Sequence, residues 1–153
     1  MIQYRFLHPG EEQAACALVE FVFNEFVAPD LGPEGVQEFF RFANPIAMAA
    51  RSGPEQIVVV AEHNSSLVGM IELRNGNHVS LLFVSLRGQS IARELLLRAA
   101  KECQLRQPDI TKLTVNSSLY AEPMYRRLGF QPTSEPQTIN GIRHIPMLLV
   151  LHA

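Results

Sequence analysis

Seven consecutive residues between an apolar stretch and a helical pattern have the chemistry of an anion-binding site. An apolar strand pattern covers 78–84, and apolar residues at helical spacing follow from Ser90. The first turn of a helix leaves backbone N–H groups without partners and carries partial positive charge, so anions bind there. Small residues let an anion approach the backbone, and the two arginines add charge. The residues expected to bind the anion are Arg87, Gly88, Gln89, Ser90, Ile91, Ala92 and Arg93.

This segment contains neither of two common phosphate-binding motifs. The chain has no G-x-x-x-x-G-K-[ST] and no G-x-G-x-x-G followed by an acidic residue at the expected distance, so ordinary nucleotide hydrolysis and nicotinamide binding are poorly supported. The segment instead resembles motif A of the GCN5-related N-acetyltransferase (GNAT) family, in which a strand ending in Val precedes [QR]-x-x-G-x-[GA] at the start of a helix. Val84 matches the strand end, and Arg87, Ser90 and Ala92 match the three defined positions, with Ser90 in place of the usual Gly.

A second segment, residues 113–130, resembles motif B of the same family. That motif is a strand, an Asn, and a helix ending in Y-x-x-L-G-F. Gly129 also suits the left-handed residue that commonly ends a helix. The residues in register with the motif are Asn116, Ala121, Tyr125, Leu128, Gly129 and Phe130.

The resemblance implies acetyl-CoA as cosubstrate. In the family the motif A loop holds the pyrophosphate, and the preceding strand binds the pantetheine arm through its backbone. Phe83 and Val84 occupy that place here, and Asn116 is expected to contact the pantetheine arm or the surroundings of Tyr125. Asn116 could also cap the following helix. The predicted function is direct transfer of an acetyl group from acetyl-CoA to a primary amine of a small molecule or peptide.

Acetyl transfer from a thioester to an amine requires a proton donor for the departing thiolate and a proton acceptor for the amine. Tyr125 has the place in Y-x-x-L-G-F that the family commonly uses to protonate coenzyme A, so the resemblance implies that it is the acid. A packing role for its ring is the alternative. Glu72 interrupts the apolar strand LVGMIEL, where a charge is costly unless it faces a cleft or a partner. We expect it to be the base, and the alternative is a carboxylate at a sheet edge.

The acceptor site is the least determined part of this prediction. His78 could replace Glu72 as base or orient the amine, since imidazole titrates near neutrality, or it could be a solvated residue at a strand end. Glu25 and Phe26 belong to an aromatic and acidic segment that could hold a cationic amine, although such helix faces are more often core with a solvated rim. The sequence has no H-x-x-x-H or H-E-x-x-H pairing, so we expect no metal site.

Composition sets the remaining expectations. A chain of 153 residues that is 47% hydrophobic predicts one domain, residues 1–153, with a proper core. Its 13 basic and 15 acidic residues give no overall field for nucleic acid. The apolar runs at 57–61 and 147–151 are far shorter than the ~20 residues of a membrane helix, and the N-terminus has no signal-peptide pattern. We therefore expect a cytoplasmic protein without a membrane partner, and a homodimer through the C-terminal strands is plausible.

Apolar periodicity and turn residues predict a mixed α/β fold. Asn44 and Pro45 are expected to end the second helix, and residues 55–84 to form an antiparallel meander. The resemblance implies the GNAT arrangement, a central mixed and mostly antiparallel sheet flanked by helices, in which the strands ending at Val84 and Asn116 splay apart to form the cofactor cleft. Strands are expected at 2–7, 55–63, 67–75, 78–84, 111–117, 130–137 and 142–151, and helices at 10–27, 33–43, 90–107 and 119–128.

Two other classes of function stay open from the sequence. Ser90 and a loop about two residues shorter than in most family members are compatible with a catalytically degenerate acyl-CoA-binding or interaction module. A structural protein without any cofactor is the third interpretation, which the close match to motif B opposes.

Overall fold

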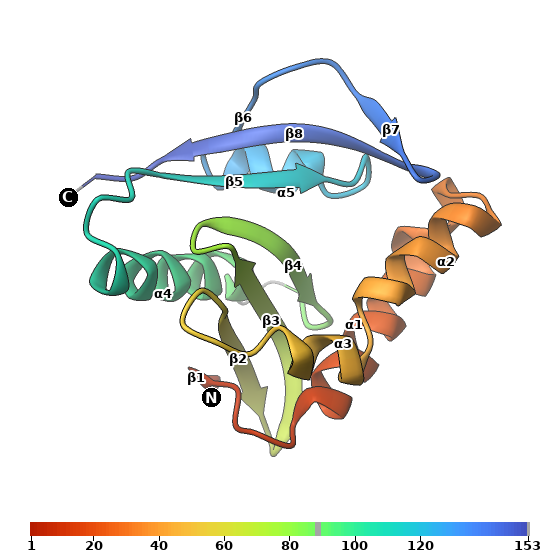
Figure 1. Ribbon diagram of the computed structural model, residues 1–153. Helices are drawn as coiled ribbons and strands as arrows, with labels where there is room; N and C mark the ends of the chain where they lie inside the picture. Colours follow the sequence, from red (N-terminus) through yellow and green to blue (C-terminus); the bar gives the residue numbers. More distant parts are fainter. Residues whose placement is uncertain (88–89, 153) are drawn as a thin grey trace.

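The computed structural model describes residues 1–87 and 90–152, and Figure 1 shows a sheet with helices on both of its faces. Most elements lie within a few residues of the ranges expected from the sequence. Along the chain the elements are β1 (Gln3–Phe6), α1 (Glu12–Phe26), the 3₁₀ turn η1 (Ala28–Asp30), α2 (Pro33–Phe42), α3 (Pro45–Ala50), β2 (Ile57–His63), β3 (Ser66–Arg74), β4 (His78–Val84), α4 (Ile91–Arg106), β5 (Lys112–Ser117), α5 (Glu122–Arg127), β6 (Gln131–Pro132), β7 (Gln137–Ile139) and β8 (Ile142–Val150).

The strands form a mixed, mostly antiparallel sheet, which confirms the predicted fold class. Its order is β1-β2-β3-β4-β5-β8-β6, and β7 pairs with β8. The only parallel pair among the described residues is β4 with β5, and it spans just two registers, His78 with Thr114 and Val79 with Val115. Beyond these registers the two strands no longer pair, so the predicted splay between them is present.

A β-bulge in β4 lies at the point where the two strands part. Glu72 pairs with Leu81 and Leu73 with Val79, so Ser80 is an extra residue without a partner on β3. The Ser80 hydroxyl donates a hydrogen bond to the Glu72 carbonyl oxygen at 3.2 Å. Because a bulge bends its strand and increases the local twist, it turns β4 away from β5 at this point.

Apolar side chains fill both faces of the sheet, and the helices cover them. The helix α4 packs on one face, where apolar residues of alternate strand positions gather. The helices α1 and α3 cover the other face (Figure 1). The residues of α4 that are buried against the sheet are Ile91, Leu95, Leu96, Ala99, Ala100 and Cys103, as its periodicity predicted.

Two expectations from the sequence need correction. Asn44 and Pro45 do end α2, but they also start α3, because the Asn44 side chain accepts a hydrogen bond from the Ala47 N–H at 2.9 Å and Pro45 occupies the first helical position. The strand expected at 130–137 is instead two short strands, β6 and β7, that pair with opposite ends of β8. β7 and β8 meet at the turn Asn140–Gly141, whose positive φ angles suit those two residues.

Candidate active site

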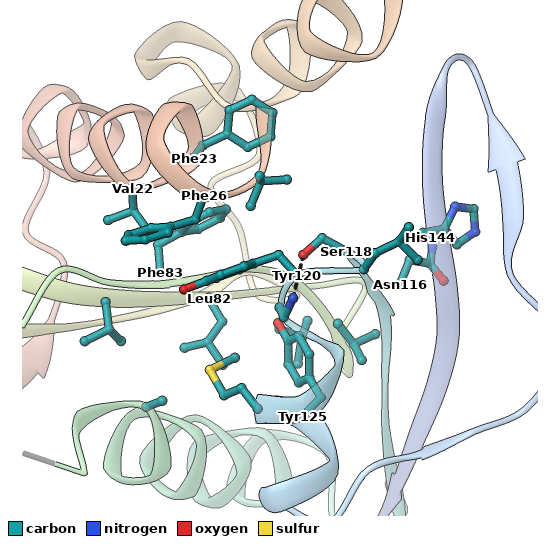
Figure 2. A pocket seen from close by; sticks show the side chains of 18 of the residues that line it. Val22, Phe23, Phe26, Leu82, Phe83, Asn116, Ser118, Tyr120, Tyr125 and His144 are labelled. Atoms are coloured by element: carbon teal, nitrogen blue, oxygen red, sulfur yellow. Dashed lines mark hydrogen bonds between the residues drawn. The ribbon is translucent and has the colours of Figure 1, made fainter. Parts of the chain in front are cut away.

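A large cavity lies beside the divergence of β4 and β5. Its volume is about 1410 Å³. Its walls come from the end of α1, from α2, β4 and β5, from the start of α4, from α5, and from the β7–β8 turn. Figure 2 shows aromatic side chains on one side of this space and Tyr125 on the other. Residues far apart in the sequence therefore meet around one space.

The expected anion-binding residues line one part of the cavity. Arg87, Ser90, Ile91, Ala92 and Arg93 all contribute to its wall, while Gly88 and Gln89 lie outside the described residues. Ser90 directly precedes α4 and has a left-handed backbone, with φ of 53°. The free N–H groups of the first turn of α4 and the basic residues Arg87 and Arg93 thus line the same cavity, which suits a pyrophosphate. The Arg87 guanidinium carbon lies 5.4 Å from the centroid of the Phe26 ring.

The middle of the cavity is bordered by one edge of β4. β3 pairs with the opposite edge as far as Val84, but β5 pairs only with His78 and Val79. Beyond Val79, the backbone groups on the cavity edge of β4 therefore have no strand partner among the described residues. Phe83 and Val84 are in this segment and line the cavity. An extended amide-bearing chain could bind here as an additional strand would.

Tyr125 combines burial with an unpartnered hydroxyl group. It lies on α5, is 5% exposed and lines the cavity, and its ring meets the edge of Phe130 at a centroid distance of 5.3 Å. Within residues 1–87 and 90–152, no group forms a hydrogen bond with its hydroxyl. Burial raises the pKa of the Tyr125 phenol, so it keeps its proton at neutral pH. It is a proton donor without an acceptor in the part of the chain that the structure describes.

Asn116 lies on β5, exposed and lining the same cavity. It was a candidate both for cofactor contact and for capping the next helix. The Ser118 hydroxyl accepts the hydrogen bond from the Ala121 N–H at 3.1 Å, so Ser118 rather than Asn116 makes the side-chain contact at the start of α5. Asn116 is exposed and lines the cavity, so its amide can contact a ligand there.

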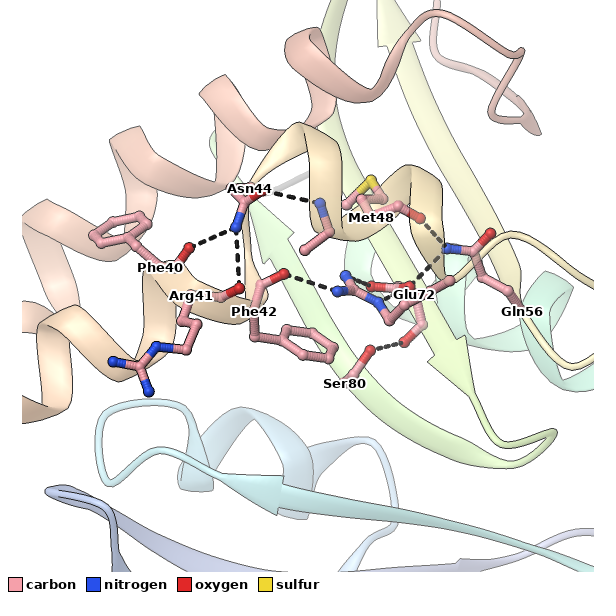
Figure 3. Close-up of polar contacts among 10 residues, drawn as sticks. Phe40, Arg41, Phe42, Asn44, Met48, Gln56, Glu72 and Ser80 are labelled. Atoms are coloured by element: carbon pink, nitrogen blue, oxygen red, sulfur yellow. Dashed lines mark hydrogen bonds and ion pairs between the residues drawn. The ribbon is translucent and has the colours of Figure 1, made fainter.

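Glu72 is not among the residues that line the cavity. It is 0% exposed on β3, an inner strand, so the alternative of a carboxylate at a sheet edge is wrong. Its two oxygens accept hydrogen bonds from Arg51 Nε at 3.0 Å, from Arg51 Nη2 at 2.9 Å and from Gln56 Nε2 at 2.8 Å (Figure 3). The carboxylate links β3 to the end of α3, and this arrangement gives its predicted role as base no support.

His78 lines the cavity at the start of β4. Its Nδ1 is 2.8 Å from Thr114 Oγ1, the residue opposite it on β5. Burial, and then the charge of Arg74, lower the pKa of His78 to about 4. The imidazole is therefore neutral at pH 7, and it is half-buried rather than a solvated strand end.

Aromatic rings form the side of the cavity opposite α4 and α5. Phe26, the last residue of α1, stacks on Tyr120 with centroids 5.1 Å apart and an interplanar angle of 15°. Phe39 meets the edge of Phe83 at 5.9 Å. Glu25 also lines the cavity but is exposed, so it belongs to the rim.

These observations are compatible with one known family. A family model described as an acetyltransferase (GNAT) domain matches residues 27–151. The chain belongs to this GNAT acetyltransferase family. A search of curated proteins finds no match.

Solved structures with the same fold include several acetyltransferases. A GCN5-related N-acetyltransferase from Rhodopseudomonas palustris has a TM-score of 0.79 and 22% identity, over 97% of this chain and 95% of that chain. The PaiA N-acetyltransferase from Thermoplasma acidophilum, solved in complex with coenzyme A, has a TM-score of 0.72 and 17% identity, over 98% and 99%. The aminoglycoside 6'-N-acetyltransferase from Enterococcus faecium has a TM-score of 0.70 and 14% identity, over 99% and 98%.

In this GNAT protein the described residues fit an acyl-CoA. The cavity offers basic groups at the start of α4, an unpaired strand edge in its middle and a protonated phenol nearby. Among the described residues, no cluster of three or more His, Cys, Asp and Glu is arranged to hold a metal ion. None of their helices is long and apolar enough to cross a bilayer.

Sequence reasoning missed three features of this site. The bulge at Ser80 depends on pairing with β3, which no local pattern indicates. His144 is buried on β8 and reaches the cavity only because β8 pairs with β5. Arg74 lines the cavity as well, and its only signal was its position two residues after Glu72, on the same face of the strand.

Proposed function

We propose that this GNAT protein transfers the acetyl group of acetyl-CoA directly to a primary amine of a small molecule or peptide. The observation that carries the proposal is Tyr125, a buried residue that lines the cavity beside the β4–β5 divergence and whose hydroxyl has no hydrogen-bond partner among the described residues. Membership of the family supports acetyl transfer in general. The identity of the acetyl donor, acetyl-CoA, and of the acceptor, a primary amine, is what this proposal adds to the family assignment.

The cofactor would be held by groups from three elements. Arg87, Arg93 and the first N–H groups of α4 would bind the pyrophosphate, because they combine full charges with the partial charge of a helix end. The free edge of β4 near Phe83 and Val84 would bind the amides of the pantetheine arm. The Asn116 side chain, on β5, would bind the same arm across the gap.

Proton donation to the thiolate and orientation of the amine are assigned to two titratable side chains that line the cavity, Tyr125 and His78. Acetyl-CoA would supply a thioester whose C–S bond breaks as the C–N bond to the amine forms. Tyr125 donates its proton to the departing sulfur, which suits a phenol that stays protonated at neutral pH. The neutral imidazole of His78 accepts a hydrogen bond from the amine and orients it, and the amine proton leaves to solvent.

A second candidate function is a binding module that holds an acyl-CoA without turning it over. Ser90 favours this alternative, because it occupies a left-handed backbone position where the family motif usually has Gly. The strain at that position could weaken cofactor binding. Turnover with any amine would exclude this alternative.

Thermal unfolding with acetyl-CoA, coenzyme A and ATP tests the proposal. A ligand at a hundred times its Kd stabilises a protein by about 2.7 kcal/mol, which is a shift of several degrees. We expect a shift with acetyl-CoA and coenzyme A that Arg87→Glu removes and Lys101→Glu retains, since Lys101 is exposed and does not line this cavity. No shift with millimolar acetyl-CoA contradicts the proposal.

Release of coenzyme A in the presence of primary amines is the second measurement, and a thiol-reactive dye detects it. Binding together with amine-dependent thiol release supports the acetyltransferase. Binding without release from a broad amine panel supports the non-catalytic module.

A further inference from the structure

We propose that Arg74 binds a carboxylate on the acceptor, so that the substrate class is an amine that also carries a carboxylate, such as an amino acid. This inference rests on the proposed acetyltransferase function and specifies its second substrate. It depends on the position of Arg74, on its missing partner and on the charges around it.

Arg74 lines the cavity beside His78, the residue to which the proposed function assigns the acceptor amine. It is the last residue of β3 and pairs with His78, the first residue of β4. Both residues line the cavity, and the Arg74 guanidinium carbon lies 5.4 Å from the centroid of the Phe42 ring. Side chains of directly paired residues are about 5 Å apart at Cβ. A molecule whose amine and carboxylate are separated by a few bonds can therefore contact His78 and Arg74 together.

The Arg74 side chain has no acidic partner among the described residues. Its Nε is buried and forms no hydrogen bond, and no carboxylate of the described chain lies within ion-pair distance. Glu72, two residues earlier, faces the same side of β3, but both of its oxygens are taken by Arg51 and Gln56. Figure 3 shows this closed network. A half-buried guanidinium without a counterion is costly, and an anion in the cavity would lower that cost.

The planar guanidinium suits a carboxylate in particular. Arginine presents its N–H donors as a rigid fork that matches the two oxygens of a carboxylate. The Arg74 guanidinium lies over the Phe42 ring, with its central carbon 5.4 Å from the ring centroid. The Arg51 guanidinium carbon lies 3.6 Å from the centroid of the same ring. Because Arg51 is already bound to Glu72, Arg74 is the guanidinium of this pair that can receive a ligand.

The acidic residues of the cavity do not reverse this inference. Glu25 and Asp30 are exposed, where charges interact weakly across water. Glu38 forms an ion pair with Arg41 at 3.1 Å. His78 is neutral at pH 7 and does not compete for an anion. Of the charged groups just considered, Arg74 is thus the one that is both half-buried and unpaired.

Matched ligand pairs test the inference. The probes are L-phenylalanine with 2-phenylethylamine, L-leucine with 3-methylbutylamine, and L-lysine with 1,5-diaminopentane, which differ only by the carboxylate. Thermal unfolding is followed with each probe at millimolar concentration and without cofactor. We expect at least one amino acid to stabilise the protein more than its matched amine, and Arg74→Gln to abolish that difference. The control Arg98→Gln removes an exposed arginine of α4 that does not line the cavity, and it should retain the difference.

Equal stabilisation by both members of every pair, or by neither, overturns the inference. The comparison within the unchanged protein holds even where Arg74→Gln folds poorly. A separate thermal unfolding experiment with acetyl-CoA alone tests the proposed function. Failure of the proposed function would remove the shift with acetyl-CoA, whereas failure of this inference would remove only the difference between amino acid and matched amine. Where acetylation is measurable, Arg74→Gln should raise the KM of the amino acid about tenfold to a hundredfold and leave the KM of the matched amine unchanged. Arg74→Lys retains the charge but loses the planar pair of donors, so its KM for the amino acid should lie between those of the unchanged protein and Arg74→Gln.

Discussion

Arg51 and Glu72 form a buried two-point ion pair, with Arg51 Nη2 2.9 Å from Glu72 Oε1 and Arg51 Nε 3.0 Å from Glu72 Oε2. The Glu72 carboxylate is fully buried, and the Arg51 side chain is 18% exposed. Arg51 also donates a hydrogen bond to the Phe42 carbonyl oxygen at 2.8 Å. The pair therefore connects the end of α3 to an inner strand of the sheet, and neither residue lines the cavity.

Replacing Glu72 should lower stability much more than catalysis. Glu72→Ala leaves the Arg51 guanidinium without its counterion and should reduce the free energy of unfolding by about 3 kcal/mol, which urea unfolding measures. Glu62→Ala, which removes a partly exposed ion pair with Arg5, should cost less than about 1 kcal/mol. Turnover per folded molecule should change less than threefold. A large loss of turnover at unchanged stability would make Glu72 the base after all.

Tyr125→Phe should reduce turnover and leave cofactor affinity nearly unchanged. The substitution removes the proton donor, and general acids typically contribute about a hundredfold or more in rate. Since no hydrogen bond of the described chain involves the hydroxyl, stability should not fall. Steady-state rates and coenzyme A titration measure the two effects. Tyr120→Phe is the matched control, and equal effects of both substitutions would assign Tyr125 a packing role.

Ser90→Gly should stabilise the protein and tighten cofactor binding. Ser90 has φ of 53°, a conformation that costs a residue with a side chain about 1–2 kcal/mol, partly offset by the greater chain entropy of glycine. The net gain should be about 0.5 kcal/mol in urea unfolding. Ser65→Gly relieves similar strain at φ of 65° in an exposed turn, so it should raise stability without changing the Kd for acetyl-CoA. If Ser90→Gly and Ser65→Gly bind acetyl-CoA with the same Kd, the backbone strain at Ser90 does not affect cofactor binding, and the prediction is wrong.

His78 should make stability depend on pH below neutrality. Its pKa in the folded protein is about 4, lowered by burial and by Arg74, from an unfolded value near 6.5. Between these values the unfolded chain binds a proton that the folded chain does not, so the free energy of unfolding falls as the pH falls from about 6.5 to 4. His78→Gln should flatten this part of the profile, measured by urea unfolding, while the exposed control His152→Gln should not. An unchanged slope in His78→Gln would show that the imidazole is solvated.

The pH profile of turnover should follow the amine rather than His78. An ordinary amine has a pKa near 10.4, and only its neutral form is nucleophilic, so kcat/KM should increase through the neutral range. Tyr125 stays protonated over this range because burial raises its pKa. An acceptor of lower pKa should shift the rising limb by the difference between the two amine pKa values. If the rise of kcat/KM with pH is the same for both amines, the titrating group belongs to the protein and not to the amine.

The motifs predicted the local structure around Arg87 and Tyr125 correctly, because strand and helix patterns depend mainly on residues close together in the chain. The strand before Arg87 and the helix after Ser90 follow from periodicity within a short window. The short helix that carries Tyr125 and the positive φ of Gly129 follow from Y-x-x-L-G-F. Local patterns could not show α3, since the same Asn44 and Pro45 that end one helix also cap the next.

The sequence by itself determined the order of most elements, the family resemblance and several of the residues that end or begin the helices. Tertiary structure alone decided what Glu72 and Arg74 do, because a partner on a distant element determines whether a charge on a strand is neutralised or free. Glu72 meets Arg51 and Gln56, which lie 21 and 16 residues away along the chain, while Arg74 on the same strand face meets no acid among the described residues. Side-chain alternation puts both on one face, but only the packing of α3 on that face gives a counterion to one of them.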